Sequence, residues 1–550
     1  MRSIVVAILI INVSHCIAGE PAVSSWTEFR NGGSSHSAAE VPVSWSPDKG
    51  ISWQKELPGY GQSSPVVFNG RVYVTTVVGP MKDECQVLCL DLKTGEHTWV
   101  WSQEASSKAA SNYMASRAAP TPMVDANGVY AFFEGGDLIA INHDGSLKWK
   151  RSLTSEYGKF ENNHGLGSSP TQTSDLVIVN IEHKGPSYLL AVDKSTGETR
   201  WKVDRPTGSS WTSPIVIECD GKHQIVVSSG GAVTGYDPAD GRQIWTVGGL
   251  SGNSVPSPTA VGPYLFVGAR IPEFGSPLEA SQSNLCLKLD ASSDGKHEVV
   301  WRANKAVCDY ASPVVDGDCA YYLNKVGVLY CVSSVTGENN YTERLGTTCW
   351  ATPIVAGGKV FFFGKDGKTQ VISNGPTFSK VSTNLLWDPK NAPAPESYKE
   401  HQGGGGHGHG DGHTESVANK PDGESTEGGA TGAATTSETP NDATGGPGSG
   451  RRGGPGGGMV AMLLKSDANA DGKISAEELP AEFKEMMAQV DLNKDSLIDA
   501  EELKAMEESF RKRREGSRDS ARDPIVYGVA AADGAFIIRT GTRLYCVRGH

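Results

Sequence analysis

The segment DKSTGETRW, Asp193–Trp201, contains a turn rich in Asp, Thr and Gly and ends in a tryptophan. Asp and Thr side chains can hydrogen-bond to the backbone of a tight turn, and glycine accepts the positive φ that such a turn needs. The alternating segment LLAV comes directly before it. We therefore predict a β-hairpin whose second strand carries Trp201.

Related hairpins recur along the chain, as VLCLDLKTGEHTW, LIAINHDGSLKW, VTGYDPADGRQIW and LKLDASSDGKHEVVW. Between them lie copies of a short segment with proline after a small residue. The seven prolines are Pro65, Pro122, Pro170, Pro214, Pro258, Pro313 and Pro353. A period of about 40 to 45 residues with loop insertions is typical of a four-stranded propeller blade. The regular spacing of the tryptophans suggests indole rings packed between neighbouring blades.

This pattern resembles the pyrroloquinoline-quinone-like (PQQ-like) β-propeller family. The resemblance covers roughly Trp26 to Leu386 and Pro524 to His550. The family includes quinoprotein dehydrogenases, a lipoprotein subunit of the outer-membrane β-barrel assembly machine and many exported proteins. The resemblance therefore implies the fold and leaves the function open.

The two ends of the repeat region complement each other. The C-terminal segment YGVAAADGAFIIRTGTRLYCVRG has the pattern of three strands without the last one of a blade, and ISWQKEL, from Ile51, has the pattern of that last strand. Pairing the two would remove free sheet edges. We predict an all-β, eight-bladed β-propeller that is closed by its N- and C-terminal strands.

An insertion separates the seventh blade from the eighth. Without Pro389 to Arg522, the distance from Pro353 to Ala530, taken as the equivalent of the repeat's proline, is that of one ordinary repeat. The predicted parts are a signal peptide (1–18), the propeller (19–388), a disordered Gly/His-rich linker (389–458), a small α-helical EF-hand pair (459–515), a short linker (516–523) and the eighth blade (524–550).

The insertion contains two candidate calcium loops. An EF-hand loop supplies oxygen ligands from positions 1, 3, 5, 7, 9 and 12, with glycine at position 6. In DANADGKISAEE the ligands are Asp467, Asn469, Asp471, the Lys473 carbonyl, Ser475 and Glu478. In DLNKDSLIDAEE they are Asp491, Asn493, Asp495, the Leu497 carbonyl, Asp499 and Glu502. Gly472 fills position 6 of the first loop, but Ser496 fills it in the second, so we expect weaker binding there.

The N-terminal segment has the layout of a secretory signal, with one Arg, an apolar run from Ile4 to Val13 and small residues near Ala18. We therefore expect a periplasmic or secreted protein without a transmembrane segment. Lipid attachment at Cys16 is the rival interpretation, but His15 stands where a lipoprotein signal has a small residue. Among the other cysteines, Cys319 and Cys331 are the best candidates for a disulfide, because they flank one hairpin.

The formal net charge of -13 argues against a nucleic-acid partner. We expect instead an unidentified protein or a small ligand on the face of the propeller. The residues just before the inner strands should converge on the axis and form a polar and aromatic pocket. They are Tyr60, Arg117, His164, Trp211, Asn253, Asp309, Tyr310 and Trp350. The alternative is that these side chains only fill the mouth of the channel.

Three functions remain open at this point. The first is an exported calcium-binding scaffold, and the second is a subunit of outer-membrane protein assembly. The third is a PQQ-dependent oxidoreductase, for which the resemblance implies a vicinal Cys-Cys pair over the cofactor. The sequence contains no Cys-Cys dipeptide. We therefore expect Ca²⁺ but not PQQ as a cofactor, and we assign no catalytic residues.

Overall fold

The computed structural model describes residues 24–109, 115–162, 164–219, 221–272, 276–289, 297–393 and 525–549, together with parts of 467–505. Contacts divide the chain into two units, 1–398 with 522–550, and 399–521. Each is described by itself below. The predicted signal peptide, most of the Gly/His-rich linker and the linker at 516–523 lie outside the described residues.

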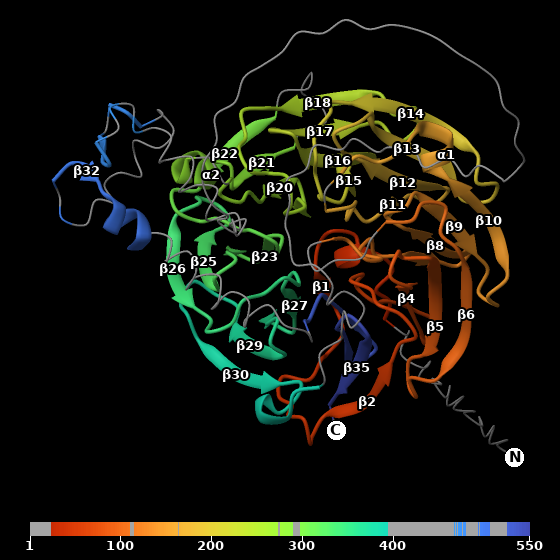
Figure 1. The fold of residues 1–550 in the computed structure, drawn as a ribbon. Helices are drawn as coiled ribbons and strands as arrows, with labels where there is room; N and C mark the ends of the chain where they lie inside the picture. The colour runs from red at the N-terminus through yellow and green to blue at the C-terminus, as the bar shows by residue number, and fades with distance from the viewer. Residues whose placement is uncertain are drawn as a thin grey trace, which may run out of the picture. The chain divides into compact units, whose positions relative to one another are not determined.

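The first unit is an eight-bladed β-propeller, as predicted (Figure 1). Blade 1 contains β3 (Val66–Phe68), β4 (Arg71–Val78), β5 (Glu84–Asp91) and β6 (His97–Glu104). Blade 2 contains β7 (Met123–Asp125), β8 (Gly128–Phe132), β9 (Asp137–Ile141) and β10 (Leu147–Ser152). Blade 3 contains β11 (Thr171–Gln172), β12 (Leu176–Ile181), β13 (Ser187–Asp193) and β14 (Thr199–Arg205). Blade 4 contains β15 (Ile215–Cys219), β16 (Lys222–Ser229), β17 (Ala232–Tyr236) and β18 (Gln243–Val247).

The other four blades have the same order. Blade 5 contains β19 (Thr259–Val261), β20 (Tyr264–Val267), β21 (Leu285–Lys288) and β22 (Glu298–Arg302). Blade 6 contains β23 (Val314–Asp316), β24 (Cys319–Leu323), β25 (Val328–Ser333) and β26 (Asn339–Arg344). Blade 7 contains β27 (Ile354–Ala356), β28 (Lys359–Phe363), β29 (Lys368–Ser373), β30 (Lys380–Leu385) and the added strand β1 (His36–Ser37). Blade 8 contains β33 (Gly528–Ala532), β34 (Ala535–Arg539), β35 (Arg543–Arg548) and β2 (Ile51–Glu56).

Helices in the propeller unit are short. In its described residues they are η1 (Phe29–Asn31), α1 (Leu153–Tyr157), α2 (Pro277–Gln282) and η2 (Pro389–Asn391). None of the helices in the described residues is long and apolar enough to cross a membrane.

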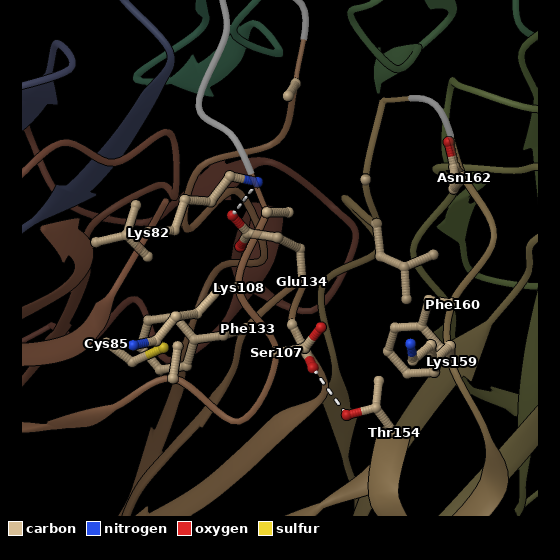
Figure 2. A pocket seen from close by; sticks show the side chains of 17 residues that line it. Lys82, Cys85, Ser107, Lys108, Phe133, Glu134, Thr154, Lys159, Phe160 and Asn162 are labelled. Atoms are coloured by element: carbon tan, nitrogen blue, oxygen red, sulfur yellow. Dashed lines mark hydrogen bonds and ion pairs between the residues drawn. The ribbon is translucent and has the colours of Figure 1, made fainter. Parts of the chain in front are cut away.

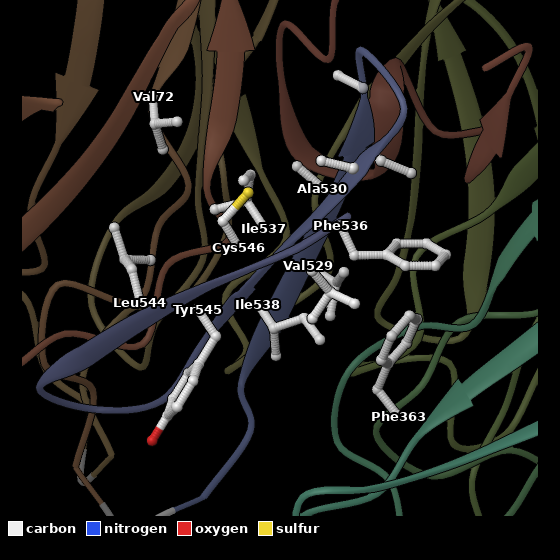
Figure 3. Packing of buried hydrophobic residues seen from close by; sticks show 14 of the residues in the cluster. Val72, Phe363, Val529, Ala530, Phe536, Ile537, Ile538, Leu544, Tyr545 and Cys546 are labelled. Carbon is white, nitrogen blue, oxygen red and sulfur yellow. The ribbon is translucent and has the colours of Figure 1, made fainter. Parts of the chain in front are cut away.

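Blade 8 joins strands from the two ends of the repeat region. β2 pairs antiparallel with β35, with Lys55 opposite Leu544. The blade packs against blade 7 through Phe536, whose ring centroid lies 4.9 Å from that of Phe361 and 5.3 Å from that of Phe363. Figure 3 shows this apolar cluster around β33, β34 and β35. Burial of such a cluster stabilises the ring by removing apolar area from water.

A belt of hydroxyl groups holds the inner strands in register. In six successive blades, the residue before the proline donates its backbone N–H to the hydroxyl of the equivalent residue in the next blade, over 2.9–3.2 Å. This hydroxyl belt comprises Ser64, Thr121, Ser169, Ser213, Ser257, Ser312 and Thr352. The bonds explain why Ser or Thr precedes proline in each repeat: the hydroxyl satisfies a buried donor of the neighbouring blade.

The eighth blade departs from the belt at Gly528. A Cβ there would lie 2.3 Å from the Ser64 hydroxyl, so no side chain fits. The hairpin register aligns Gly528 with the belt position and therefore places Val529, not Ala530, at the position of the repeat's proline. The sequence alignment was wrong by one residue because the turns of the hairpins differ in which residues they use.

Tryptophans pack between blades, as expected from their spacing. Trp149 of blade 2 donates its indole N–H to the Lys194 carbonyl of blade 3 over 2.9 Å, and its ring covers Gly197. Gly197 has a φ of 78°, and a Cβ there would lie 2.7 Å from the ring. The glycine of the turn is thus required both by its backbone conformation and by the indole above it.

Residues 24–37 form a strap that contacts all eight blades around the axis. Its backbone pairs with Val67 of blade 1 and Val124 of blade 2, and Glu28 accepts a hydrogen bond from Thr171 of blade 3. Gly33 lies against Ile215 of blade 4. The strap was not anticipated from the sequence.

The other half of the strap reaches the remaining blades. The buried Arg30 guanidinium donates to the Pro258 carbonyl of blade 5 over 2.9 Å, and His36 lies 2.5 Å from the Val315 carbonyl of blade 6. β1 then pairs parallel with β27 of blade 7, and Ser37 donates to the Ala531 carbonyl of blade 8.

The predicted disulfide does not form. Cys319 and Cys331 are both buried free thiols. Strand register places Cys319 opposite Ser333 and Cys331 opposite Tyr321, so the two cysteines are diagonal rather than directly paired. The centre of the hairpin turn lies one residue further along the chain than the sequence suggested, so the two cysteines do not face each other.

Candidate functional site

The candidate axial site lies where the chain enters the inner strands. Each predicted residue comes a few positions before a belt hydroxyl, and the belt therefore fixes the height at which its side chain approaches the axis. The strap contacts Val67, Val124 and Val315, the middle residues of their inner strands, and Ala531 near the end of β33. The axial residues come before the inner strands, whereas the strap contacts residues within these strands or, at Pro258, directly before one.

Four aromatic rings form a continuous chain at this site. Tyr310 lies 5.4 Å from Trp350, and Trp350 lies 5.6 Å from Tyr527, between ring centroids. Tyr527 and Tyr60 are arranged edge to face at 6.2 Å, with their hydroxyl oxygens 2.8 Å apart. This row of rings brings together residues of blades 6, 7, 8 and 1 and provides flat, partly exposed surfaces for a ligand.

Two cationic side chains, Arg117 and Lys365, lie against these rings. We call the four rings and the two cations together the aromatic cluster: Tyr60, Arg117, Tyr310, Trp350, Lys365 and Tyr527. The Arg117 guanidinium carbon lies 3.3 Å from the Tyr60 ring centroid, and the Lys365 ammonium lies 4.1 Å from that of Trp350. Such contacts are electrostatically favourable. They also give the aromatic cluster a positive character that suits an acidic or electron-rich ligand.

Asp309 and Tyr310 are adjacent in sequence but have different surroundings. The Asp309 carboxylate is buried and accepts the Lys325 N–H over 2.7 Å. Tyr310 is 39% exposed. Burial, and then the negative charge of Asp309, raise the pKa of the Tyr310 phenol, which therefore stays protonated and able to donate a hydrogen bond.

His164 and Trp211 form a second, separate pair, with ring centroids 5.9 Å apart. The Trp211 indole donates to the Gly165 carbonyl over 2.9 Å, which fixes the ring beside the exposed His164. Asn253, in the connection from blade 4 to blade 5, differs from both, because it is buried and hydrogen-bonded to Gly231, Ser228 and Ala232 of blade 4. Its amide braces blade 4, so we place it outside the ligand-binding set.

Tyr527 and Lys365 belong to the cluster but were not identified from the sequence. Tyr527 precedes β33, whose blade lacks the Ser-Pro signal that located the other positions. Lys365 lies in the turn after β28, away from the entry to an inner strand. A search that aligned the eighth blade by its strand pattern would have found Tyr527; no sequence signal pointed to Lys365.

The second candidate site is the first EF-hand loop. Glu478 accepts hydrogen bonds from the Asn469 N–H over 3.3 Å and from the Ser475 N–H and hydroxyl over 2.9 Å each. Asp467 accepts the Gly472 N–H over 2.9 Å, and Asn469 and Asp471 hydrogen-bond to each other. Five predicted ligand residues are thus joined around one loop, and the Lys473 N–H is bonded to Asp471.

The second loop repeats these bonds where the structure describes it. Glu502 accepts the N–H groups of Asn493 and Asp499 over 3.2 and 3.1 Å. Asp495 accepts the Leu497 N–H over 2.9 Å. Asp491 lies outside the described residues.

The two loops are joined by a short sheet. β31 (Ile474–Ser475) pairs antiparallel with β32 (Leu497–Ile498), so the two isoleucines at position 8 face each other and are buried. Residues 500–505 are helical. Gly472 has a φ of 80°, and Ser496 has a φ of 65°, the strained position expected for a non-glycine residue.

The donor set suits calcium better than a softer metal. The loops offer carboxylate, amide, hydroxyl and carbonyl oxygens, which Ca²⁺ prefers. In the parts of the chain that the structure describes, no three His, Cys, Asp or Glu side chains converge as a metal site. Any metal bound here would therefore have to use the mixed oxygen set of the loops.

Comparisons with known proteins match the propeller and the insertion to different families. The sequence profile of a family described as outer membrane protein assembly factor BamB matches residues 38–179 and 158–269. A profile described as EF hand matches residues 459–487 and 483–506. Residues 38–269 of the propeller are thus similar to that family, and the insertion is similar to EF hands.

Two curated relatives share part of the propeller. An outer membrane protein assembly factor BamB from Alkalilimnicola ehrlichii is 28% identical over 182 residues, which is 33% of this chain and 42% of the relative. Its counterpart from Burkholderia pseudomallei is 26% identical over 226 residues, 40% of this chain and 54% of the relative. The chain thus spans about half the length of the curated relatives that it matches.

Solved structures show similarity at low sequence identity. BamB from Moraxella catarrhalis is 16% identical with a TM-score of 0.42, covering 60% of this chain and 87% of that one. A europium-containing methanol dehydrogenase is 11% identical with a TM-score of 0.44, covering 66% and 86%.

Proposed function

We propose that the protein is an exported, calcium-binding scaffold that captures a partner on the aromatic cluster of its propeller. The observation that supports this most is the continuous chain of Tyr310, Trp350, Tyr527 and Tyr60. Aromatic side chains dominate binding energy at interfaces because they bury a large area at low entropic cost. All four rings are at least partly exposed, so a partner can reach them.

A site-specific cross-link tests the aromatic cluster. A photo-reactive phenylalanine analogue placed at Tyr310, which is 39% exposed, should form an adduct in the exported fraction of the native host. The same analogue at Val335, 63% exposed in blade 6, is the matched control. We expect Trp350→Ala to remove the adduct at 310. Equal adducts at 310 and 335, or an adduct at 310 that survives Trp350→Ala, would contradict the proposal.

The calcium function rests on the first EF-hand loop. Glu478 accepts three hydrogen bonds from the loop, and as the residue at position 12 it would bind calcium through both oxygens. Glu478→Gln should abolish the tighter of two calcium events in calorimetry and leave the melting of the propeller unchanged. The neighbouring exposed Glu477→Gln is the control and should keep both events. Two equal events, or none at millimolar calcium, would count against the assignment.

Outer-membrane protein assembly is a second candidate function. It is favoured by the family profile and by the two relatives, which carry that name. Identification of the partner cross-linked at Tyr310 separates the two possibilities. A component of outer-membrane assembly would support this candidate, and any other partner would leave the general scaffold.

PQQ-dependent oxidation is the alternative that we rank lowest. The sequence contains no Cys-Cys dipeptide of the kind that the resemblance implies over the cofactor. Dye reduction by the protein with PQQ, calcium and a panel of alcohols should not exceed a protein-free control. Clear turnover would reverse the ranking.

A further inference from the structure

We propose that a cavity between blades 1, 2 and 3 binds a small organic carboxylate with an apolar or aromatic body. The cavity has a volume of about 330 Å³. None of the eight axial residues predicted from the sequence lines it, so it is distinct from the aromatic cluster. This inference goes beyond the proposed scaffold function, and its ligand is a small molecule rather than a protein partner.

A buried ammonium provides the positive charge. The Lys82 side chain is 8% exposed; its ammonium donates to the Ser116 carbonyl over 2.7 Å and pairs with Glu134 at 3.2 Å. An ammonium has three donors, so one N–H remains for a ligand. Lys82 also has a φ of 53°, a costly conformation for a residue other than glycine. Backbone strain of this kind concentrates at functional positions.

Two further donors face the cavity. The side-chain nitrogen of Asn162 is buried and has no hydrogen-bond partner in the described part of the chain. Its oxygen is already used, because it accepts the His164 N–H over 3.0 Å. Lys159 is exposed at the rim and makes no ion pair with the described residues. An unpaired buried N–H is costly and is satisfied by an acceptor that enters the cavity.

The carboxylates near the cavity already have charged or N–H partners, although Oε1 of Glu134 makes no hydrogen bond in the described part of the chain. Glu134 pairs with Lys82 and accepts the Ala118 N–H over 3.0 Å. Asp137, next to the cavity, accepts hydrogen bonds from Gln103 and from the N–H and hydroxyl of Ser106. A cationic ligand would find Glu134 already paired with Lys82, whereas an anion finds donors on Asn162 and Lys159 that have no partner among the described residues. The balance favours a negatively charged ligand.

The walls determine the rest of the ligand. Phe133 and Phe160 lie on either side of the cavity in Figure 2, with the Lys82–Glu134 pair and Asn162 toward its other end. Val77 and Leu166 add to the apolar lining. A pocket with apolar walls and a few placed polar groups is the usual form of a small-molecule site. A fully hydrated inorganic anion would leave these walls unused.

Binding of 3-phenylpropionate to the full-length protein, followed by saturation-transfer NMR and calorimetry, tests the proposal. We expect saturable binding with a dissociation constant of about 1 mM or lower, as for a ligand of this size. The neutral 3-phenylpropan-1-ol, which has the same apolar body, should bind at least about tenfold more weakly because it cannot pair with Lys82. Trp350→Ala, in the aromatic cluster, should leave this binding unchanged.

Asn162→Asp is the decisive variant. It keeps the oxygen that His164 uses but replaces the free donor with a negative charge, so affinity for the carboxylate should fall at least about tenfold. Asn339→Asp, the same change at an exposed position of blade 6, is the matched control and should have no effect. Lys159→Gln alters an exposed side chain that folding does not need, and it should weaken binding about threefold.

Three results would overturn the proposal. One is equal affinity for the acid and the alcohol, and another is undiminished binding of the acid by Asn162→Asp and Lys159→Gln. The third is the absence of saturable binding at 10 mM ligand by a protein that near-UV circular dichroism shows to be folded.

Discussion

Ser496 shows how one residue sets the difference between two calcium loops. Both Gly472 and Ser496 have positive φ values, 80° and 65°. Glycine adopts this conformation without strain, whereas a residue with a Cβ pays about 1 kcal/mol. Ser496→Gly should therefore raise the calcium affinity of the second loop about fivefold, as measured by calorimetry. Gly472→Ser should weaken the calcium affinity of the first loop by a similar factor. Unchanged affinities in both variants would show that the backbone conformation at position 6 does not set the calcium affinity.

Glu28 introduces a pH-sensitive group into the strap. Burial raises the pKa of its carboxyl to about 7, against the smaller opposing effects of the Thr171 hydrogen bond and the Lys194 charge. The folded protein thus holds a proton on Glu28 at a pH where the unfolded chain, with an ordinary pKa near 4.5, has lost it. Because the folded state binds more protons between these two values, the stability from this group falls as pH rises from about 4.5 to 7.

Glu28→Gln should remove this dependence. A neutral amide keeps an acceptor for Thr171 without a buried charge, so the variant should be more stable than the natural protein by about 1–2 kcal/mol at pH 8, after allowance for partial exposure. At pH 5 the two should be nearly equal. Urea unfolding at both pH values measures the difference. A variant that is equally destabilised at both would show that the carboxyl is ionised in the fold.

At the scale of the element, the contact between Trp149 and Gly197 makes the hairpin turn part of the interface between two blades. Gly197→Ala would add both backbone strain and a clash with the indole, and we expect it to cost about 2–4 kcal/mol of unfolding free energy. Gly221→Ala is the matched control, since its φ of 74° is similar but nothing lies within 4 Å of the added methyl. It should cost only about 1 kcal/mol. Equal losses in urea unfolding would attribute the whole effect to strain and none to the indole.

Trp245 is an exception to this arrangement of indoles between blades. Trp245 does not reach the next blade by a hydrogen bond; its indole donates to the Gln224 side chain of its own blade over 2.7 Å. The corresponding turn of blade 5 falls within 290–296, outside the described residues. His297 packs edge to face against the same indole, with centroids 4.4 Å apart.

For the whole molecule, the N-terminal region contributes twice, through the strap and through β2. A chain that begins at Ala38 lacks the strap but keeps β2, and should melt several degrees lower while remaining monomeric. A chain that begins at Pro58 also lacks β2, exposes the edge of β35 and should aggregate. Light scattering and thermal melting of the two truncations measure the contributions separately. A Pro58 chain that stays monomeric with unchanged melting would contradict the role of β2.

The repeat itself was readable from the sequence. The turn of Asp193–Trp201 and the seven Ser-Pro or Thr-Pro segments carry local requirements, positive φ at a glycine and a hydroxyl before a proline, that each blade must meet separately. Because every blade must meet these same local requirements, the same residues recur in the sequence, and the repeat predicts the eight-bladed fold. The EF-hand loops were readable for a similar reason, since all their ligands lie within twelve consecutive residues.

Other features depend on contacts between residues that are far apart in the chain. The aromatic cluster joins Tyr60 to Tyr527, and the cavity joins Lys82 to Asn162 through the packing of three blades. The strap meets the blades through unlike residues, two of which, Arg30 and Ser37, each contact two blades, so it leaves no repeating signal. The register of Gly528 was likewise decided by steric conflict with Ser64. The sequence alone thus determined the blades and the calcium loops, whose causes are local, while the tertiary structure decided which side chains from different blades meet at the axis, in the cavity and under the strap.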